Sequence, residues 1–298
     1  MRAATGSARV WRVLDRDIPI ARPVIAGILN VTPDSFSDGG CFADPRTAVA
    51  RAWEIAEEGA AILDIGAEST RPGADPVPAD VEWARLEPVL AALGDLPIPV
   101  SVDTAKLAVA ERALDAGAAA INDVTALRQD PGLAALAART GAGLVLMHMR
   151  GTPGTMQRNT GYRDVVAEVR AALVAARDAA LEAGCAPDQV ALDPGLGFGK
   201  SVEGNLELLA RLDEIASIGA PMWIGPSRKS FLGALLDVGP RDLVTASVAA
   251  GLTAARRGAD VLRVHDVRPT HEALTVEASI NAREPVERPH ARAAGRHG

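Results

Sequence analysis

Short apolar runs alternate with longer helical stretches along most of this chain. Each run is mostly apolar and is bounded by Gly, Pro or Asp, which is typical of strands buried on both faces of a parallel sheet. Eight such runs predict eight strands. They cover residues 24–30, 61–65, 98–103, 118–122, 143–148, 190–194, 222–225 and 261–265.

The stretches between these runs are rich in Ala, Leu, Glu and Arg at helical spacing. The clearest are 45–58, 104–116, 162–183 and 241–257. A glycine follows each of these stretches, at the position that commonly ends a helix in the left-handed conformation. The glycines are Gly59, Gly117, Gly184 and Gly258.

Eight strands that alternate with helices predict an α/β fold, a single (β/α)8 TIM barrel over residues 24–283. A doubly wound sheet is the competing fold, but the 195–200 segment lacks the glycine spacing of a nucleotide-binding motif. We expect residues 1–23 to form a leader, as a hairpin that plugs one end of the barrel. Residues 284–298 lack periodicity and are expected to be a disordered tail.

Composition excludes several classes of protein. With 48% hydrophobic and 23% charged residues, the chain is not expected to be disordered. No apolar run approaches the roughly 18 residues of a membrane span, and residues 1–10 lack a secretory signal. Cys41 and Cys185 are too few for a disulfide framework, which favours the cytoplasm. A net charge of −7 argues against binding to nucleic acid or an anionic membrane.

Polar side chains end nearly every predicted strand. In a barrel these ends meet at one mouth, where the active site lies. For a single residue, a cap or a salt bridge would be the simpler explanation, but a whole ring indicates a ligand site. The ring comprises Asn30, Asp64, Asp103, Asn122, His148, Asp193, Ser227–Ser230, Arg263 and His265.

Lysine and phenylalanine are both rare, and both follow predicted strands. The three lysines among 31 basic residues are Lys106, Lys200 and Lys229. A phenylalanine on a loop can stack on a flat aromatic ligand, although packing of the loop onto the barrel is the alternative, above all for Phe42 and Phe231. The four are Phe36, Phe42, Phe198 and Phe231.

The last two strands predict an anion site. Arg228, Lys229, Arg263 and His265 would form a cationic arc where barrels often bind phosphate. Asn30 could complete the coordination of Mg²⁺ if substrate phosphates and waters supplied the remaining oxygens.

Seven sequence blocks resemble the dihydropteroate synthase family, in the order that the family has them. They are GILNVTPDSFSDGG (27–40), DIGAESTRPGA (64–74), SVDT (101–104), IND (121–123), LDPGLGFGK (192–200), SRKSFLG (227–233) and RVHDV (263–267). The resemblance implies a transferase of folate biosynthesis, usually a homodimer. Such enzymes join 7,8-dihydropterin-6-ylmethyl diphosphate to 4-aminobenzoate and release diphosphate, and sulfonamides compete for the aminobenzoate site. Ala67 replaces a common glycine, and Pro226 precedes the SRKS run, but neither change removes an expected contact.

The resemblance also implies roles for individual residues. Asn30 would bind Mg²⁺ and, with Arg263 and His265, the diphosphate. The pterin would contact Asp103, Asn122, Asp193 and Lys229. The aminobenzoate site would comprise Phe36, Thr70, Arg71, Pro72, Phe198 and Ser230. Asp193 suits the two adjacent N–H donors of a pterin, and Lys229 suits its acceptor side.

We expect diphosphate to leave before the amine attacks. Mg²⁺, Arg263 and His265 would stabilise the leaving group, with Arg71 and Lys229 completing the catalytic set. Asp38, in the first loop, would stabilise the pterin-methyl cation.

Several alternative functions remain open. They are a methyltetrahydrofolate-binding methyltransferase domain, a Schiff-base aldolase barrel and a non-catalytic pterin-binding paralogue. Metal ligation by His148 with Cys185 is a further, weaker alternative because no second-site spacing supports it.

Overall fold

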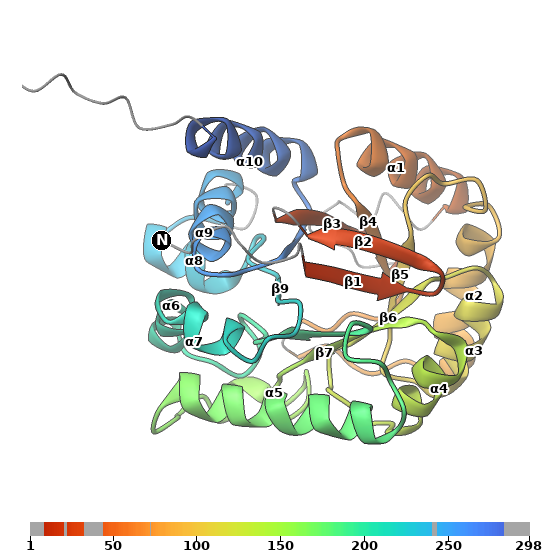
Figure 1. Ribbon diagram of the computed structural model, residues 1–298, viewed down its shortest axis with the longest axis horizontal. Coiled ribbons are helices and arrows are strands. Elements are labelled where there is room, and N and C mark those ends of the chain that lie inside the picture. Colours follow the sequence, from red (N-terminus) through yellow and green to blue (C-terminus); the bar gives the residue numbers. More distant parts are fainter. Residues whose placement is uncertain (1–8, 21–22, 33–43, 72, 240–242, 283–298) are drawn as a thin grey trace, which may run out of the picture.

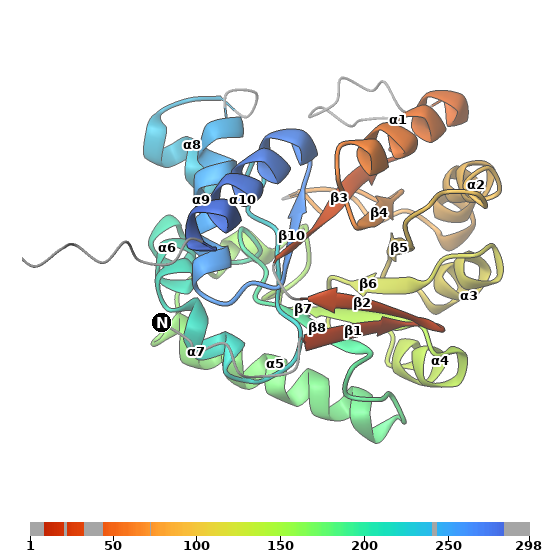
Figure 2. The ribbon, with the colours of Figure 1, turned by 45° about the horizontal axis from the view of Figure 1, so that its top comes forward.

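The computed structural model describes residues 9–20, 23–32, 44–71, 73–239 and 243–282. In this part of the chain, eight parallel strands form a barrel with helices packed around its outside (Figures 1 and 2). The strands are β3 (Val24–Asn30), β4 (Ile62–Gly66), β5 (Val100–Asp103), β6 (Ala120–Asp123), β7 (Gly143–Met147), β8 (Val190–Asp193), β9 (Trp223–Ile224) and β10 (Val261–Val264). Each pairs with the next in the order β8-β7-β6-β5-β4-β3-β10-β9, and a bridge between Leu192 and Met222 joins the two ends. The predicted TIM barrel is confirmed.

The helices follow the strands and cover the outer face of the barrel. They are α1 (Pro45–Glu57), α2 (Ala79–Leu90), α3 (Leu107–Asp115), α4 (Gly132–Thr140), α5 (Val165–Glu182), α6 (Val202–Ala210), α7 (Leu212–Ala216), α8 (Ser230–Leu236), α9 (Val244–Arg256) and α10 (Val267–Asn281). Two begin at an aspartate whose carboxylate accepts from the first-turn amides, Asp44 for α1 and Asp164 for α5. No helix of the described residues is long and apolar enough to cross a membrane.

Two separate apolar layers hold the barrel together. The larger layer lies between the strands and the helices and contains Ile65, Leu86, Leu144 and Leu192. Phe231 belongs to this layer, 3% exposed within α8, so it packs a helix onto the barrel. The second layer lies inside the barrel and includes Ala26, Ile62, Ala120, Val145, Ala191, Trp223 and Val261.

An antiparallel hairpin of β1 (Arg9–Val13) and β2 (Arg16–Ile20) covers one end of the barrel (Figure 2). Trp11 is fully buried against Trp223, with ring centroids 5.2 Å apart, and its indole N–H donates to the Gln189 carbonyl at 2.8 Å. The Arg12 and Leu14 amides donate to the carbonyls of Asp188 and Gly141, just before β8 and β7. The hairpin therefore packs at the amino-terminal end of the barrel, opposite the mouth where active sites lie.

Alternation along the strands separates this plug from the polar mouth. Parallel pairing aligns Ala26 with Ile62 near the plug, and Asn30 with Gly66 at the other end of the same two strands. The two positions on each strand are four residues apart, an even separation, so they point to the same face of the sheet. The inside of the barrel is therefore apolar at one end and polar at the other.

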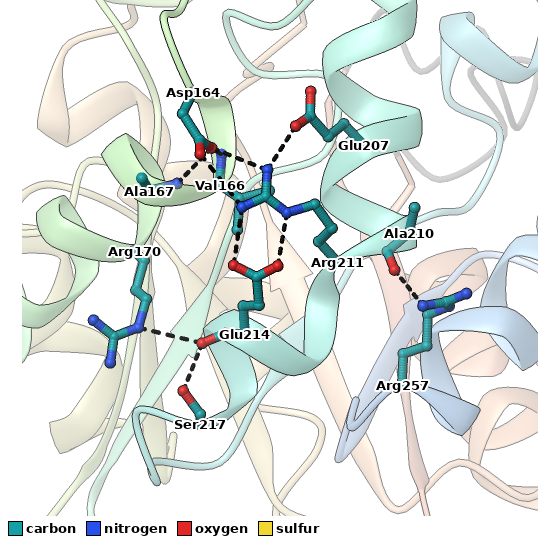
Figure 3. A network of polar contacts seen from close by, with 10 residues as sticks. All are labelled: Asp164, Val166, Ala167, Arg170, Glu207, Ala210, Arg211, Glu214, Ser217 and Arg257. Carbon is teal, nitrogen blue, oxygen red and sulfur yellow. Dashed lines mark hydrogen bonds and ion pairs between the residues drawn. The ribbon is translucent and has the colours of Figure 1, made fainter.

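Arg211 ties three helices together on the outside of the barrel (Figure 3). From the junction of α6 and α7, it binds Asp164 at the start of α5, Glu207 and Glu214. This network fixes the helices that follow β7 and β8 relative to one another.

Candidate active site

A layer of buried and half-buried polar and charged side chains lies inside the carboxyl end of the barrel. Arg263 of β10 donates from Nε to Asp64 of β4 at 2.5 Å and from Nη2 to Asp103 of β5 at 2.7 Å. Asn122 of β6 donates to the same Asp64 oxygen at 3.1 Å. The other Asp64 oxygen is buried and accepts no hydrogen bond from any described residue. One guanidinium thus joins carboxylates from two other strands.

The strand register places the neighbouring residues at the same level. Asn30, Gly66, Asp103 and Asn122 are consecutive partners across β3, β4, β5 and β6. A Cβ at Gly66 would lie 3.3 Å from the Asp103 Cβ and 3.8 Å from Asn30 Oδ1. The glycine therefore leaves space between Asn30 and Asp103.

Asp193 and Lys229 form the opposite side of the layer. Asp193 ends β8, and its Oδ1 accepts from the Gly195 amide at 2.7 Å. Lys229 precedes α8, and its Nζ lies 4.3 Å from the ring centre of Phe198. Phe198 is 8% exposed and packs with Met147, Met149 and Met156. It is therefore a largely covered platform for Lys229.

Burial and opposite charges shift the ionisation of this layer. Burial lowers the pKa of Lys229 to about 8, and Arg263 acts in the same direction, against Asp193 and Asp103. Burial raises the pKa of Asp103 to about 7, although Arg263 opposes that shift. Burial also raises the pKa of Asp193, against its bond from Gly195. Burial alone would lower the pKa of Arg263, but Asp64 and Asp103 raise it. The layer therefore combines a permanent cation with groups that titrate closer to neutrality.

The predicted cationic arc is modified by two pairings. Arg228 binds both oxygens of Asp266, at 3.1 and 2.7 Å, so its charge is largely neutralised. The Nδ1 atom of His265 lies 3.1 Å from the Ser227 hydroxyl. Burial lowers the pKa of His265 well below its usual value, and Arg228 and Arg263 lower it further. A neutral imidazole here is a polar contact for a ligand and not a cation.

The loop between β4 and α2 is fastened near its start and near its tip. Near its start, Arg85 donates to the Ala67 carbonyl at 2.7 Å, and Glu68 accepts from the Val77 amide at 3.0 Å. Near its tip, the Gly73 amide donates to the Pro153 carbonyl at 3.1 Å. Thr70 and Arg71 lie between these points, and Arg71 contributes to the lowered pKa of both Lys229 and His265. Arg71 is therefore close enough to the mouth to affect its charges.

The structure brings together most of the predicted site residues that it describes, but not all of them. Ser230 is exposed, as the first residue of α8. Asp38, Phe36 and Pro72 lie outside the described residues. His148 and Cys185 have separate partners, because the Cys185 thiol donates to the Ala134 carbonyl while His148 contacts Lys200.

Two functional candidates, Asp64 and Ser227, had no assigned role from the sequence. Asp64 joins Arg263 to Asn122, and Ser227 contacts His265. A carboxylate inside an apolar strand was a signal for Asp64, because such a group needs a partner. Its partner could not be identified, since Arg263 lies 199 positions away in the chain.

Comparison with known proteins identifies relatives over almost the whole chain. Residues 26–265 match the family model described as pterin binding enzyme. The dihydropteroate synthase of Neisseria meningitidis serogroup B is 46% identical over 273 residues, covering 90% of this chain and 96% of that protein.

Solved structures agree in fold as well as in sequence. One of dihydropteroate synthase from Xanthomonas albilineans with 4-aminobenzoic acid has a TM-score of 0.85 and 46% identity, covering 92% of this chain and 100% of the other. One from Thermus thermophilus in complex with 6HMPPP has a TM-score of 0.80 and 48% identity, covering 91% and 100%. The resemblance carried by the seven sequence blocks is confirmed, and the chain belongs to the dihydropteroate synthase family.

Proposed function

We propose that the chain joins 7,8-dihydropterin-6-ylmethyl diphosphate to 4-aminobenzoate, forming 7,8-dihydropteroate and diphosphate. The observation that carries this proposal is the charged layer at the mouth. Arg263 pairs there with Asp64 and Asp103, and Asn122, Asp193 and Lys229 lie in the same layer. Relatives solved with 4-aminobenzoic acid and with 6HMPPP support the choice of substrates.

The pterin ring fits the polar groups between β5 and β8. Its 2-amino-pyrimidinone edge presents two neighbouring N–H donors, which the Asp193 carboxylate can accept together. Gly195 already binds one Asp193 oxygen, so the orientation of the carboxylate is set before substrate arrives. Lys229 would donate to the acceptor side of the ring, and Asp103 and Asn122 would complete the contacts.

The diphosphate fits the side of the mouth formed by β10 and β3. Arg263 has five N–H donors, more than its bonds to Asp64 and Asp103 use. His265 supplies a ring N–H, and Asn30 ends the adjacent strand. A bound diphosphate would raise the pKa of His265, because a nearby negative charge favours the imidazolium. These groups would stabilise the charge that develops on the leaving group.

The residues at the mouth fit Mg²⁺ only if protein and substrate together supply its oxygen ligands. Within the described ranges, no cluster of three or more His, Cys, Asp or Glu side chains could hold a metal by itself. Asn30 offers a neutral amide oxygen at the mouth, the kind of hard donor that Mg²⁺ accepts alongside phosphate oxygens and waters. When bound there, Mg²⁺ would neutralise charge on the diphosphate.

For the chemical step we propose departure of diphosphate before attack by the aminobenzoate amine. The C–O bond to diphosphate breaks, and its electron pair stays on the departing diphosphate oxygen. The amine nitrogen then bonds to the exposed methylene carbon and loses a proton. Asp38 is our choice for stabilising the cation. Thr70, Arg71, Phe198 and Ser230, with Phe36 and Pro72, would shape the aminobenzoate site, and Arg71 would face its carboxylate. We expect sulfonamides to compete there.

We also propose a homodimer, supported by exposed apolar side chains on helices α8 and α10. Leu235 and Leu236 of α8 are 50% and 55% exposed, and Val276 and Ile280 of α10 are 59% and 65% exposed. A second copy of the chain would cover such surfaces. Sedimentation at micromolar concentration tests this proposal, and a monomer at all concentrations would contradict it.

We propose a cytoplasmic location for the enzyme. Two cysteines are too few for a disulfide framework, and Cys185 is a free buried thiol.

The deciding experiment measures diphosphate release and dihydropteroate formation from the purified chain with Mg²⁺. Product formation that requires both substrates would establish the proposed reaction. Pterin binding without product would instead favour a non-catalytic paralogue. Methyl transfer from methyltetrahydrofolate without diphosphate release would favour the methyltransferase alternative.

A further inference from the structure

Lys200 is a buried lysine to which the proposed reaction assigns no role. It lies between β8 and α6 at the end of the Gly-Leu-Gly-Phe-Gly-Lys segment and is 3% exposed. Its ammonium lies 2.9 Å from the carbonyl oxygens of both Gly195 and Phe198. It also lies 3.0 Å from His148 Nδ1 and 3.3 Å from the His148 carbonyl. An ammonium has three N–H donors, so these acceptors satisfy all of them.

Glycine geometry explains how the loop can surround one ammonium. Gly195, Gly197 and Gly199 have φ values of +69°, +85° and +68°, in the left-handed region that favours glycine. A Cβ at Gly195 would lie only 2.0 Å from the His148 carbonyl oxygen. The backbone thus bends back on itself and directs two of its carbonyl groups at Lys200.

Three further polar groups of the loop are also paired. The Gly197 amide donates to Asn205 Oδ1 at 2.7 Å, and Gln157 donates to the Gly197 carbonyl at 3.0 Å. The Tyr162 hydroxyl donates to the Gly199 carbonyl at 3.0 Å. The loop is therefore built around Lys200 and held by its neighbours in a single shape.

This loop contacts the groups that would recognise a pterin. The Gly195 amide holds the Asp193 carboxylate, and the Phe198 ring lies beneath the Lys229 ammonium. A Cβ at Gly197 would lie 3.2 Å from Lys229 Cδ, so the loop backbone also packs against the Lys229 side chain. Any shift of the loop would move Asp193 and Lys229 relative to each other.

We propose that Lys200 is a positioning residue for the pterin site. Its ammonium holds the 195–199 loop in place, and this loop in turn positions Asp193 and Lys229. This inference rests on the proposed function, because it assigns the contacts of that loop to pterin recognition. Lys200 touches no substrate in this role and acts through Gly195 and Phe198.

The charges around Lys200 are compatible with this role. Burial lowers the pKa of Lys200 to about 7; Asp193 raises it, whereas Lys229 and Arg150 lower it. Burial lowers the pKa of His148 to about 3, with Lys200 acting in the same direction, so this imidazole is neutral and its Nδ1 can accept. The three carbonyl oxygens favour the charged form of the amine. A Schiff-base role suits Lys200 poorly, because its nitrogen is enclosed by acceptors.

The test compares Lys200→Met with Lys200→Gln in the full-length protein. Methionine removes every donor, whereas glutamine keeps two N–H groups. We expect Lys200→Met to raise the KM for the pterin diphosphate about tenfold or more, because it leaves buried carbonyls unpaired and the loop free to shift. The KM for 4-aminobenzoate should change less than threefold, and Lys200→Gln should restore part of the pterin affinity. Arg177→Met is the matched control, because Arg177 also donates to a carbonyl, that of Ile218, but on the outer surface.

Two further measurements keep the outcomes separate. Calorimetric binding of the pterin diphosphate without 4-aminobenzoate should weaken in parallel with the KM, and the 195–199 amides should exchange faster with deuterium. If the wild type binds the pterin but forms no product, the proposed function fails while this comparison still decides the role of Lys200. An unchanged pterin affinity in folded Lys200→Met would overturn the inference. So would equal losses for both substrates, failure of both variants to fold, or absence of pterin binding by the wild type.

Discussion

At the scale of single residues, the buried layer shows why a lysine and an arginine occupy neighbouring strand ends. Arg263 is a permanent cation with a planar fork, and it joins two buried carboxylates, of which Asp64 also accepts from Asn122. Lys229 carries a single ammonium group on a flexible side chain, and burial lowers its pKa to about 8. The arginine therefore organises the layer, while the lysine remains adjustable for a ligand.

This difference predicts how activity depends on pH. Lys229 is protonated below about pH 8 and neutral above it, so its donation to the pterin weakens as the pH rises. We expect kcat/KM for the pterin diphosphate to fall through a limb near pH 8, measured with saturating 4-aminobenzoate. Lys229→Arg keeps its charge, so its activity should be lower throughout but should lack this limb. The same limb in Lys229→Arg would assign the titration to another group.

At the scale of elements, the site depends on loops that are fastened by ion pairs. Lys106, just before α3, binds Glu68 at the start of the β4–α2 loop and Glu82 of α2, the latter at 2.5 Å. Burial alone would lower the pKa of Lys106, but Glu68 and Glu82 raise it. Glu82 is fully buried, so this lysine also neutralises a carboxylate that has no contact with water. Thr70 and Arg71 lie two and three residues after Glu68, which links Lys106 to the aminobenzoate side of the mouth.

We therefore expect Lys106→Met to affect the second substrate more than the first. Loss of the ammonium releases Glu68, and the KM for 4-aminobenzoate should rise about tenfold while that for the pterin diphosphate changes less than threefold. Initial rates with each substrate varied in turn measure this split. Arg112→Met is the control, because Arg112 also pairs α3 with α2, through Asp80, but in an exposed position. Equal effects of the two variants, or equal rises in both KM values, would contradict the assignment.

At the scale of the whole molecule, the sequence predicts the barrel better than it predicts the contacts inside the mouth. Strands buried on both faces are continuous apolar runs, so all eight could be located, and their ends identified the polar ring. The pairing of Arg263 with Asp103 joins residues 160 positions apart and depends on how the barrel closes. The glycine pattern around Lys200 suggested a loop, but only the φ angles show its carbonyls turning inward. Packing onto the barrel, the alternative given above all for Phe231, is what its burial within α8 shows, whereas Phe198 lies against Lys229.

The β1–β2 hairpin at the amino-terminal end of the barrel should contribute to stability and not to catalysis. Trp11 fills the apolar end of the interior against Trp223, and the charged layer begins two residues beyond the apolar interior residues of the same strands. Trp11→Ala should lower the free energy of unfolding by about 3–5 kcal/mol, as expected for removal of a large buried ring. Both KM values should stay within twofold of the wild type at a temperature where the variant is folded.

Trp53 provides the matched control for this prediction, because it is a tryptophan of α1 that is 37% exposed. Trp53→Ala should cost much less, since substitutions at exposed positions usually change stability by about 0.5 kcal/mol or less. Urea denaturation of the three proteins measures the difference, and steady-state kinetics measures the site. Equal costs for the two substitutions would show that the hairpin adds little to the barrel. A selective loss of pterin affinity in Trp11→Ala would show instead that the plug and the mouth are coupled through the barrel interior.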